Sequence, residues 1–217
     1  MTEPARRSTA DIVAERIRKL IAEGELLPGQ ELRQAGLAKL LSVSRVPVRE
    51  ALQSLVAAGI VRHVPDSGYT VARLSISELA QVYELRQMFE DELLRAAPPS
   101  VDAATITELE RLHAQMCELT GRDGDIYEFQ QRNLEFHMRI FMLSKLDLIV
   151  EELRRLWAIS EPYRSMWAQD PSNRARSVAG HAQMLDAIRA GDLDLLRSVT
   201  HTRRTALASD VNYLLAG

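Results

Sequence analysis

The chain has 217 residues, 46% of them apolar and 26% charged, with a formal net charge of −3 and a single cysteine. This length suits one large domain or two small ones, and one cysteine excludes a disulfide framework or a zinc site built from several cysteines. Because no run of about 18 apolar residues occurs and the N-terminal stretch lacks the apolar core of a signal peptide, we expect a cytoplasmic protein without membrane contact.

Charge is divided unevenly along the chain. Residues 1–75 carry 11 Lys or Arg against 8 Asp or Glu, whereas residues 76–217 carry 16 against 22. A basic front joined to an acidic back is consistent with an anion-binding head on a body that does not bind anionic polymers. The abundance of Leu, Ala, Arg and Glu predicts a mostly α fold.

The first third alternates helical spacing with turn signals. In chain order we expect a helix from Thr9 that stops near Gly24, a Pro28-Gly29 turn, a short helix over 35–42, a helix capped by Ser44 and ended by Gly59, and two strands, Ile60–Val64 and Tyr69–Leu74, joined by the turn Pro65–Gly68. Two helices, a tight turn, a third helix and a two-stranded wing together predict a winged helix-turn-helix domain over residues 1–74.

The third helix carries Arg45 and Arg49 one turn apart, on a face that avoids its apolar stripe. A helix that enters the major groove presents the side chains of its first turns to bases and phosphates. An arginine can pair bidentately with guanine, and the free N–H groups at the helix start suit a phosphate. An isolated arginine pair is usually a solvated surface feature, but inside this frame it predicts contact with duplex DNA.

The stretch "LLPGQELRQAGLAKLLSVSRVPVREALQSLVAAGIVRHVPDSGYTV" resembles the DNA-binding domain of the GntR family of bacterial transcription regulators. The resemblance implies that Arg45 and Arg49 contact operator bases, that Ser44 contacts a phosphate and that Gly68 forms the wing tip. Family members often carry a DNA-contacting arginine where this chain has Ala35, so either Arg33 substitutes for it or that contact is absent. The predicted DNA-binding residues are Arg33, Ser44, Arg45, Val46, Arg49, His63 and Gly68.

The remaining residues, 75–217, show no strand signal. Proline pairs, glycines and short polar stretches divide them into six predicted helices, at about 76–96, 102–120, 124–144, 146–168, 172–190 and 192–215. Their Leu- and Ile-rich stripes predict an antiparallel six-helix bundle. Ser75 or Ser77 is the expected N-cap of the first of these helices.

Three histidines of this region form a candidate metal site. Asn133 and His137 lie four residues apart on one helical face, and His181 and His201 lie ten residues before and after the turn at Gly191. Each is about 15 Å from that turn along its helix, so we expect the two imidazoles to meet at one level. Three imidazoles and an amide oxygen predict a divalent ion, Zn²⁺ or Ni²⁺, although separate histidines in a polar core are the alternative.

The bundle is similar to the FCD ligand-binding domain of the FadR subfamily of GntR regulators, in which an Asp or Asn and three histidines hold a metal. The matching residues here are Asn133, His137, His181 and His201, and the six helices resemble the shorter, VanR-type branch. The resemblance implies that Arg86 faces an effector cavity, where it would clamp a carboxylate. The alternative for Arg86 is a salt bridge with Glu90.

These observations predict a homodimeric, ligand-responsive transcription regulator that acts as a repressor. We expect it to bind a palindromic operator and to be released by a small carboxylic acid bound at the metal. Two other hypotheses remain at this point. The metal itself is the signal in one of them. In the other the chain is a metal-dependent hydrolase, for which no general base is evident because Glu135 lies on a different helical face from Asn133 and His137.

Overall fold

The computed structural model describes residues 7–65, 68–122 and 125–216. It divides into two compact units, Met1–Arg73 and Leu74–Gly217, one residue from the predicted boundary. None of the helices in these described ranges has the length and apolar character needed to cross a bilayer.

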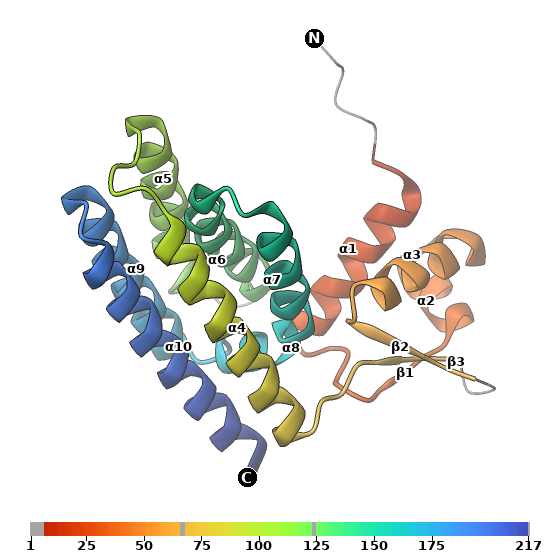
Figure 1. Ribbon diagram of the computed structural model, residues 1–217. Helices are drawn as coiled ribbons and strands as arrows, with labels where there is room; N and C mark the ends of the chain where they lie inside the picture. Colours follow the sequence, from red (N-terminus) through yellow and green to blue (C-terminus); the bar gives the residue numbers. More distant parts are fainter. Residues whose placement is uncertain (1–6, 66–67, 123–124, 217) are drawn as a thin grey trace. The chain divides into compact units, whose positions relative to one another are not determined.

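The first unit contains three helices and a small sheet (Figure 1). Its elements are α1 (Thr9–Ala22), β1 (Glu31–Leu32), α2 (Gln34–Leu41), α3 (Arg45–Ala57), β2 (Val61–Val64) and β3 (Gly68–Val71). The strands pair antiparallel in the order β1-β3-β2. The predicted winged helix-turn-helix is therefore confirmed, with an additional strand, β1, that is too short to show an alternating pattern.

Local sequence fixes the ends of α1 and α3. The Ser8 side chain accepts a hydrogen bond from the Asp11 N–H, and the Asp11 carboxylate accepts one from the Ser8 N–H, so a capping box starts α1. Gly24 and Gly59 follow α1 and α3 at φ +79° and +75°, a left-handed conformation that costs glycine little. The buried face of α3 includes Leu52, which is 0% exposed.

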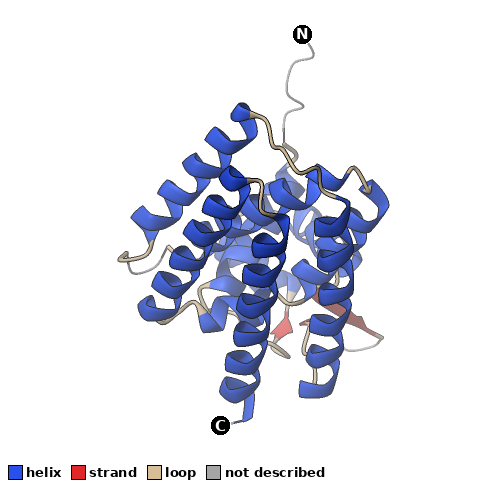
Figure 2. Ribbon diagram, turned by 60° about the vertical axis from the view of Figure 1, so that its left-hand side comes forward, coloured by secondary structure: helices blue, strands red, loops and turns tan. Residues whose placement is uncertain are grey.

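The second unit is entirely helical in its described residues (Figure 2). Its elements are α4 (Ile76–Ala96), α5 (Ala103–Leu119), α6 (Ile126–Phe141), the 3₁₀ turn η1 (Met142–Ser144), α7 (Asp147–Ile159), α8 (Glu161–Trp167), α9 (Pro171–Ala190) and α10 (Leu193–Ala216). Ser75 caps α4 in a capping box with Glu78, which confirms one of the two predicted caps.

The predicted helix over 146–168 is two helices, α7 and α8. Ser160 separates them, and Pro162 lies in the first turn of α8. A proline in the first turn has no N–H to donate, so the α7 hydrogen-bond ladder cannot run through it. The described part of this unit therefore has seven α-helices instead of six, and the helix count no longer favours the shorter, VanR-type branch.

One large apolar cluster holds the bundle together. It includes Leu109 on α5, Phe136 on α6 and Leu153 on α7, each 0% exposed. Gly191 turns the chain from α9 into α10 at φ +67°, and an added Cβ there would lie 2.9 Å from the Pro99 carbonyl oxygen. Both the backbone conformation and the close approach require glycine, and α9 and α10 consequently pack as an antiparallel pair.

Candidate nucleic-acid interface and effector cavity

The N-terminal end of α3 has features that favour the binding of an anion. Ser44 occupies the N-cap position with extended backbone, but its side chain makes no capping hydrogen bond, and the first turn contains no acidic residue. The N–H groups of this turn have no partner within the helix, and the helix dipole is positive there. A DNA phosphate would satisfy both the amides and the Ser44 hydroxyl.

The predicted base-reading side chains are accessible. Arg45 and Arg49 are exposed, and neither forms an ion pair within the described part of the chain. Val46, beside them, is 56% exposed, whereas Val48 on the opposite face is 0% exposed. The apolar core face of α3 thus points inward, whereas Val46 and the two guanidinium groups are free to contact a duplex.

Arg33 is exposed and held by a neighbour. Its Nε and Nη2 each donate to a different carboxylate oxygen of Glu31, both at 3.1 Å. These hydrogen bonds and the charge of Arg33 lower the pKa of Glu31. Arg33 would have to leave Glu31 to bind a phosphate, and the exposed Ala35 offers no side-chain donor in its place.

The wing supplies the remaining predicted residues. His63 is exposed on β2, with its ring centroid 4.9 Å from that of Tyr69 on β3. Gly68 begins β3 at φ +88°, where an added Cβ would meet nothing within 4 Å, so backbone conformation alone favours glycine there. Ser67, which belongs to the predicted turn Pro65–Gly68, lies outside the described residues.

The helical unit encloses a cavity of about 310 Å³, within the range of small-molecule sites. Helices α4, α6, α7, α8, α9 and α10 all contribute to its lining. The charged residues that line it are Arg86, Glu90, Arg164, Arg176, Arg203, Arg204 and Asp210, and the aromatic ones are Phe129, Trp157 and Trp167. The two tryptophans line the cavity, and Tyr163 packs in a core cluster with Leu79.

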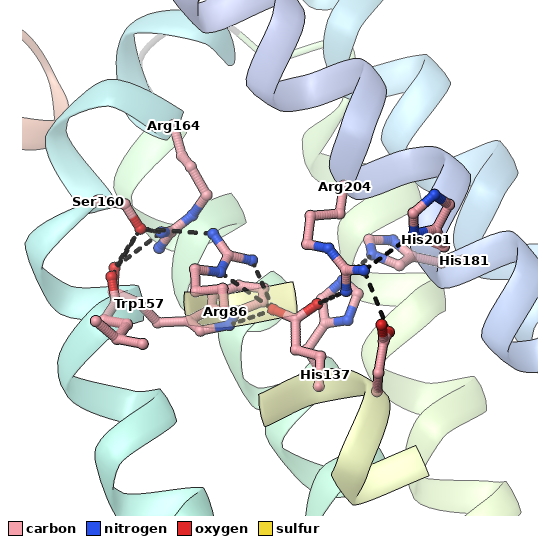
Figure 3. Close-up of polar contacts among 11 residues, drawn as sticks. Arg86, His137, Trp157, Ser160, Arg164, His181, His201 and Arg204 are labelled. Atoms are coloured by element: carbon pink, nitrogen blue, oxygen red, sulfur yellow. Dashed lines mark hydrogen bonds and ion pairs between the residues drawn. The ribbon is translucent and has the colours of Figure 1, made fainter. Parts of the chain in front are cut away.

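Arg86, Trp157 and Arg204 belong to a buried polar network (Figure 3), and all three donate to the carboxylate of Glu90. Its Oε1 accepts from Arg86 Nη2 at 3.0 Å and from Trp157 Nε1 at 3.1 Å, and its Oε2 accepts from Arg204 Nη1 at 2.7 Å. Arg86 therefore forms the predicted ion pair with Glu90, although the pair is buried, and it also lines the cavity; that it clamps an effector carboxylate stays a prediction.

Arg164 is a second buried cation beside this network. Its Nη1 donates to the Trp157 carbonyl oxygen at 2.8 Å and to Ser160 Oγ at 2.7 Å (Figure 3). Its guanidinium carbon lies 4.5 Å from the Trp157 ring centroid. Burial, reinforced by the nearby charge of Arg86, lowers the pKa of Arg164 to about 10.

Two of the predicted metal ligands come together and a third lies near them. Asn133 and His137 are buried and line the cavity from α6, and the Nε2 atoms of His137 and His181 lie 3.1 Å apart. Burial lowers the pKa of both imidazoles well below the ordinary value, and the charge of Arg203 lowers it further. Both rings are therefore neutral at pH 7. Glu135, the considered general base, is exposed and paired with Arg132.

The predicted fourth ligand, His201, does not join this group, and its placement by sequence was wrong. It is exposed, its Nδ1 lies 3.3 Å from Arg204 Nη2, and it borders a separate surface depression with Asp91 and Arg95. The equal distances of His181 and His201 from the Gly191 turn predict the height of His201 along α10, but they do not predict the direction in which its side chain points. At about 100° per residue, position 201 faces almost opposite to position 203.

Arg203 occupies the place expected for the histidine of the last helix. Its Nη2 lies 3.1 Å from His181 Nε2 and 3.1 Å from Ser177 Oγ, and its Nη1 lies 3.2 Å from Met184 Sδ. A Cβ on Gly180 would lie 2.4 Å from Arg203 Cδ and 2.5 Å from its Nε. Gly180, within α9, thus leaves the space through which the Arg203 side chain passes.

These residues do not fit a resident divalent metal. No group of three or more His, Cys, Asp or Glu suited to a metal occurs among the residues that the structure describes. A guanidinium can only donate, so His181 Nε2 must be the acceptor for Arg203 Nη2. The lone pair that a metal would need is already engaged, and a positive group lies beside it. Zn²⁺ or Ni²⁺ thus stays a prediction without a matching set of ligands.

Sequence reasoning missed Glu90, Arg164, Arg203 and Arg204 as cavity residues. For Arg204 a signal existed in the inward stripe of α10. Its buried positions, spaced by four, four and seven residues, are Leu196, Thr200, Arg204 and Val211. An arginine in an otherwise apolar or small stripe indicates a buried partner of opposite charge.

Comparisons with known proteins agree with this architecture. The family described as "Bacterial regulatory proteins, gntR family" matches residues 9–71, and the FCD domain matches residues 81–203. An HTH-type transcriptional regulator in an unstable DNA locus of Streptomyces ambofaciens is 28% identical over 93% of this chain and 84% of its own length. The gluconate operon transcriptional repressor of Bacillus licheniformis is 27% identical over 91% and 82%.

The solved structure of E. coli McbR/YncC has a TM-score of 0.77, covers 98% of this chain and 100% of its own, and is 21% identical. That likeness shows the shared fold. The FCD match spans more than half of the chain, and the GntR match covers the unit with the exposed arginines of α3. The chain therefore belongs to the GntR family of DNA-binding transcription regulators and carries an FCD domain.

Proposed function

We propose that this regulator is a homodimeric repressor whose two α3 helices bind a palindromic operator and whose affinity for DNA falls when a small carboxylate binds in the helical unit. One observation carries the effector part. The cavity is lined by five arginines but only two acidic side chains, Glu90 and Asp210. Arg176 and Asp210 form an exposed pair and Asp91 also pairs with Arg204, but the remaining arginines still outnumber these carboxylates. Such an excess of positive charge is costly unless an anion compensates it, and a carboxylate matches the guanidinium fork.

The DNA part is supported by the start of α3. Arg45 and Arg49 are exposed without carboxylate partners in the described ranges, beside an unoccupied Ser44 hydroxyl. A dimer would place two such helix ends in successive major grooves, about 34 Å apart along the duplex. An effector that favours a different dimer shape lowers operator affinity by the coupling free energy, typically about 1–3 kcal/mol.

Selection from a pool of random duplexes, followed by fluorescence anisotropy on the selected sequence, tests the DNA part. Arg45→Ala should lose the preference for the selected site over an unrelated duplex, because the discrimination of one bidentate arginine is about 1–3 kcal/mol. Arg155→Ala removes one charge from the helical unit, where Arg155 is exposed and 3.7 Å from Glu152, and should leave the preference intact. A preference that survives in Arg45→Ala contradicts the proposal.

The effector part is tested on the same duplex by titrating small organic acids into the protein–DNA complex. We expect at least one carboxylate to reduce the affinity by about 5- to 150-fold, the range of ordinary allosteric coupling. Its uncharged amide should have no effect. An affinity that is unchanged by every acid which demonstrably binds the protein would show that the cavity does not control DNA binding.

A further inference from the structure

Arg203 lies beside His181, in the place where the predicted metal site would have a histidine from the last helix. We propose that this chain binds the carboxylate of its effector directly through the Arg203 guanidinium, in a site that uses no metal ion. This inference rests on the proposed function, because it names how the effector of that function is recognised.

Two cavity arginines, Arg164 and Arg203, have no ion pair within 4 Å among the described residues, and Arg203 is the one that lies beside His181. Arg86 and Arg204 share Glu90, and Arg176 pairs with Asp210 at 2.6 Å. Arg203 forms no ion pair with any described carboxylate, and its hydrogen-bond partners are a thioether, a hydroxyl and a neutral imidazole. A guanidinium has five N–H donors, so two of them remain for a ligand.

The surrounding side chains hold this guanidinium in place. Ser177 and His181 accept from its Nη2, and His181 is itself 3.1 Å from His137 Nε2. Gly180 on α9 has no side chain, and this leaves room for Arg203 Cδ and Nε. A larger residue at this position would push the Arg203 side chain away. The two histidines thus help to orient the Arg203 guanidinium. In a metal site they would instead coordinate a metal ion.

The neighbouring cavity surface suits the rest of a small organic acid. Asn133, His137 and Thr200 contribute polar groups to the lining, and Phe129, Trp157 and Leu207 contribute apolar surface. The Nδ1 atom of His137 is buried and has no hydrogen-bond partner among the described residues, so one polar atom of this histidine pair is left unsatisfied. The expected ligand class is a monocarboxylate, with or without hydroxyl groups, that fits about 310 Å³.

Thermal unfolding in the presence of EDTA tests the inference on the full chain. The probes are lactate, benzoate and D-gluconate, each compared with its amide. We expect at least one carboxylate to raise the melting temperature while its amide does not, because a ligand that binds only the folded state stabilises it. Arg203→Gln should raise the Kd at least about 30-fold, whereas Arg189→Gln, which alters an exposed pair with Glu110, should not.

Metal dependence gives an outcome that does not rely on any variant. Equilibrium dialysis of the wild-type protein against Zn²⁺ and Ni²⁺ should leave less than one bound ion per chain. One tightly bound ion per chain, or carboxylate binding that disappears in EDTA, overturns the inference while leaving the proposed function standing. A further outcome is a carboxylate that binds in EDTA without changing the affinity for DNA. That result supports carboxylate binding by Arg203 and contradicts the proposed function. No stabilisation by any of the three carboxylates also overturns the inference.

Discussion

Gly180→Ala tests the position of Arg203 without any ligand. The substitution adds a Cβ at a point 2.4 Å from Arg203 Cδ and 2.5 Å from Arg203 Nε, so the arginine must move. Its hydrogen bonds with Ser177 and His181, both 3.1 Å, would then be lost. Since Gly180 lies within α9, the same substitution also replaces a poor helix former by the best one.

These two effects have opposite signs and can be separated by a double-mutant cycle. Losing two hydrogen bonds from a charged group costs about 3 kcal/mol at the lower end of the usual range, and alanine in a helix interior gains about 1 kcal/mol over glycine. We expect Gly180→Ala to destabilise the wild type by about 2 kcal/mol. In an Arg203→Ala background the same change should stabilise by about 1 kcal/mol, which gives a coupling free energy of about 3 kcal/mol.

Urea unfolding followed by tryptophan emission provides the measurement. The chain has two tryptophans, Trp157 and Trp167, and both belong to the helical unit, so their emission reports unfolding of that unit alone. A coupling free energy below about 0.5 kcal/mol would show that Arg203 does not lie against Gly180. The inference about the carboxylate clamp would then lose its structural basis.

Three further results are expected. Arg174→Met should destabilise the helical unit by about 3–5 kcal/mol in the same urea assay, because this buried arginine donates to the carbonyl oxygens of Thr120, Arg122, Ala168 and Gln169; a loss under 1 kcal/mol contradicts this. Arg203→His should gain one bound Zn²⁺ or Ni²⁺ per chain by dialysis, and an unchanged metal content would show that the third ligand position is elsewhere. Burial lowers the pKa of His181 well below 6.5, so the unfolded chain takes up a proton first as the pH falls. The free energy of unfolding should therefore be highest above about pH 6.5 and decrease as the pH falls below that value. The decrease should be less steep in His181→Gln, and equal slopes in the two proteins would refute this.

Much of the fold could be predicted because local signals agree with tertiary structure. Ser75 with Glu78 is a capping box readable from the sequence, and Gly191 is where the chain must turn between two long amphipathic helices. The break at Ser160 was missed because the apolar pattern continues across it. The proline two residues later was the available signal, and it was outweighed by helical periodicity.

The cavity was harder to predict because its chemistry depends on directions around a helix and on partners far apart in the chain. His201 and Arg203 are two residues apart, and only the packing of α9 against α10 decides which of them faces His181. Glu90 and Arg204 are 114 residues apart, so their pairing has no local signature. The DNA-binding head was easier, because its residues are consecutive and its surface is open to solvent.

Dimethyl sulfate footprinting on the selected operator tests most directly whether the start of α3 reads DNA under control of the helical unit. Methylation occurs at guanine N7 in the major groove, where an arginine would bind. We predict protected guanines in two half-sites about one helical turn, or a multiple of it, apart, with protection lost in Arg45→Ala and reduced when the binding carboxylate is added. Protection that persists in Arg45→Ala, or that is indifferent to a bound carboxylate, would contradict the account.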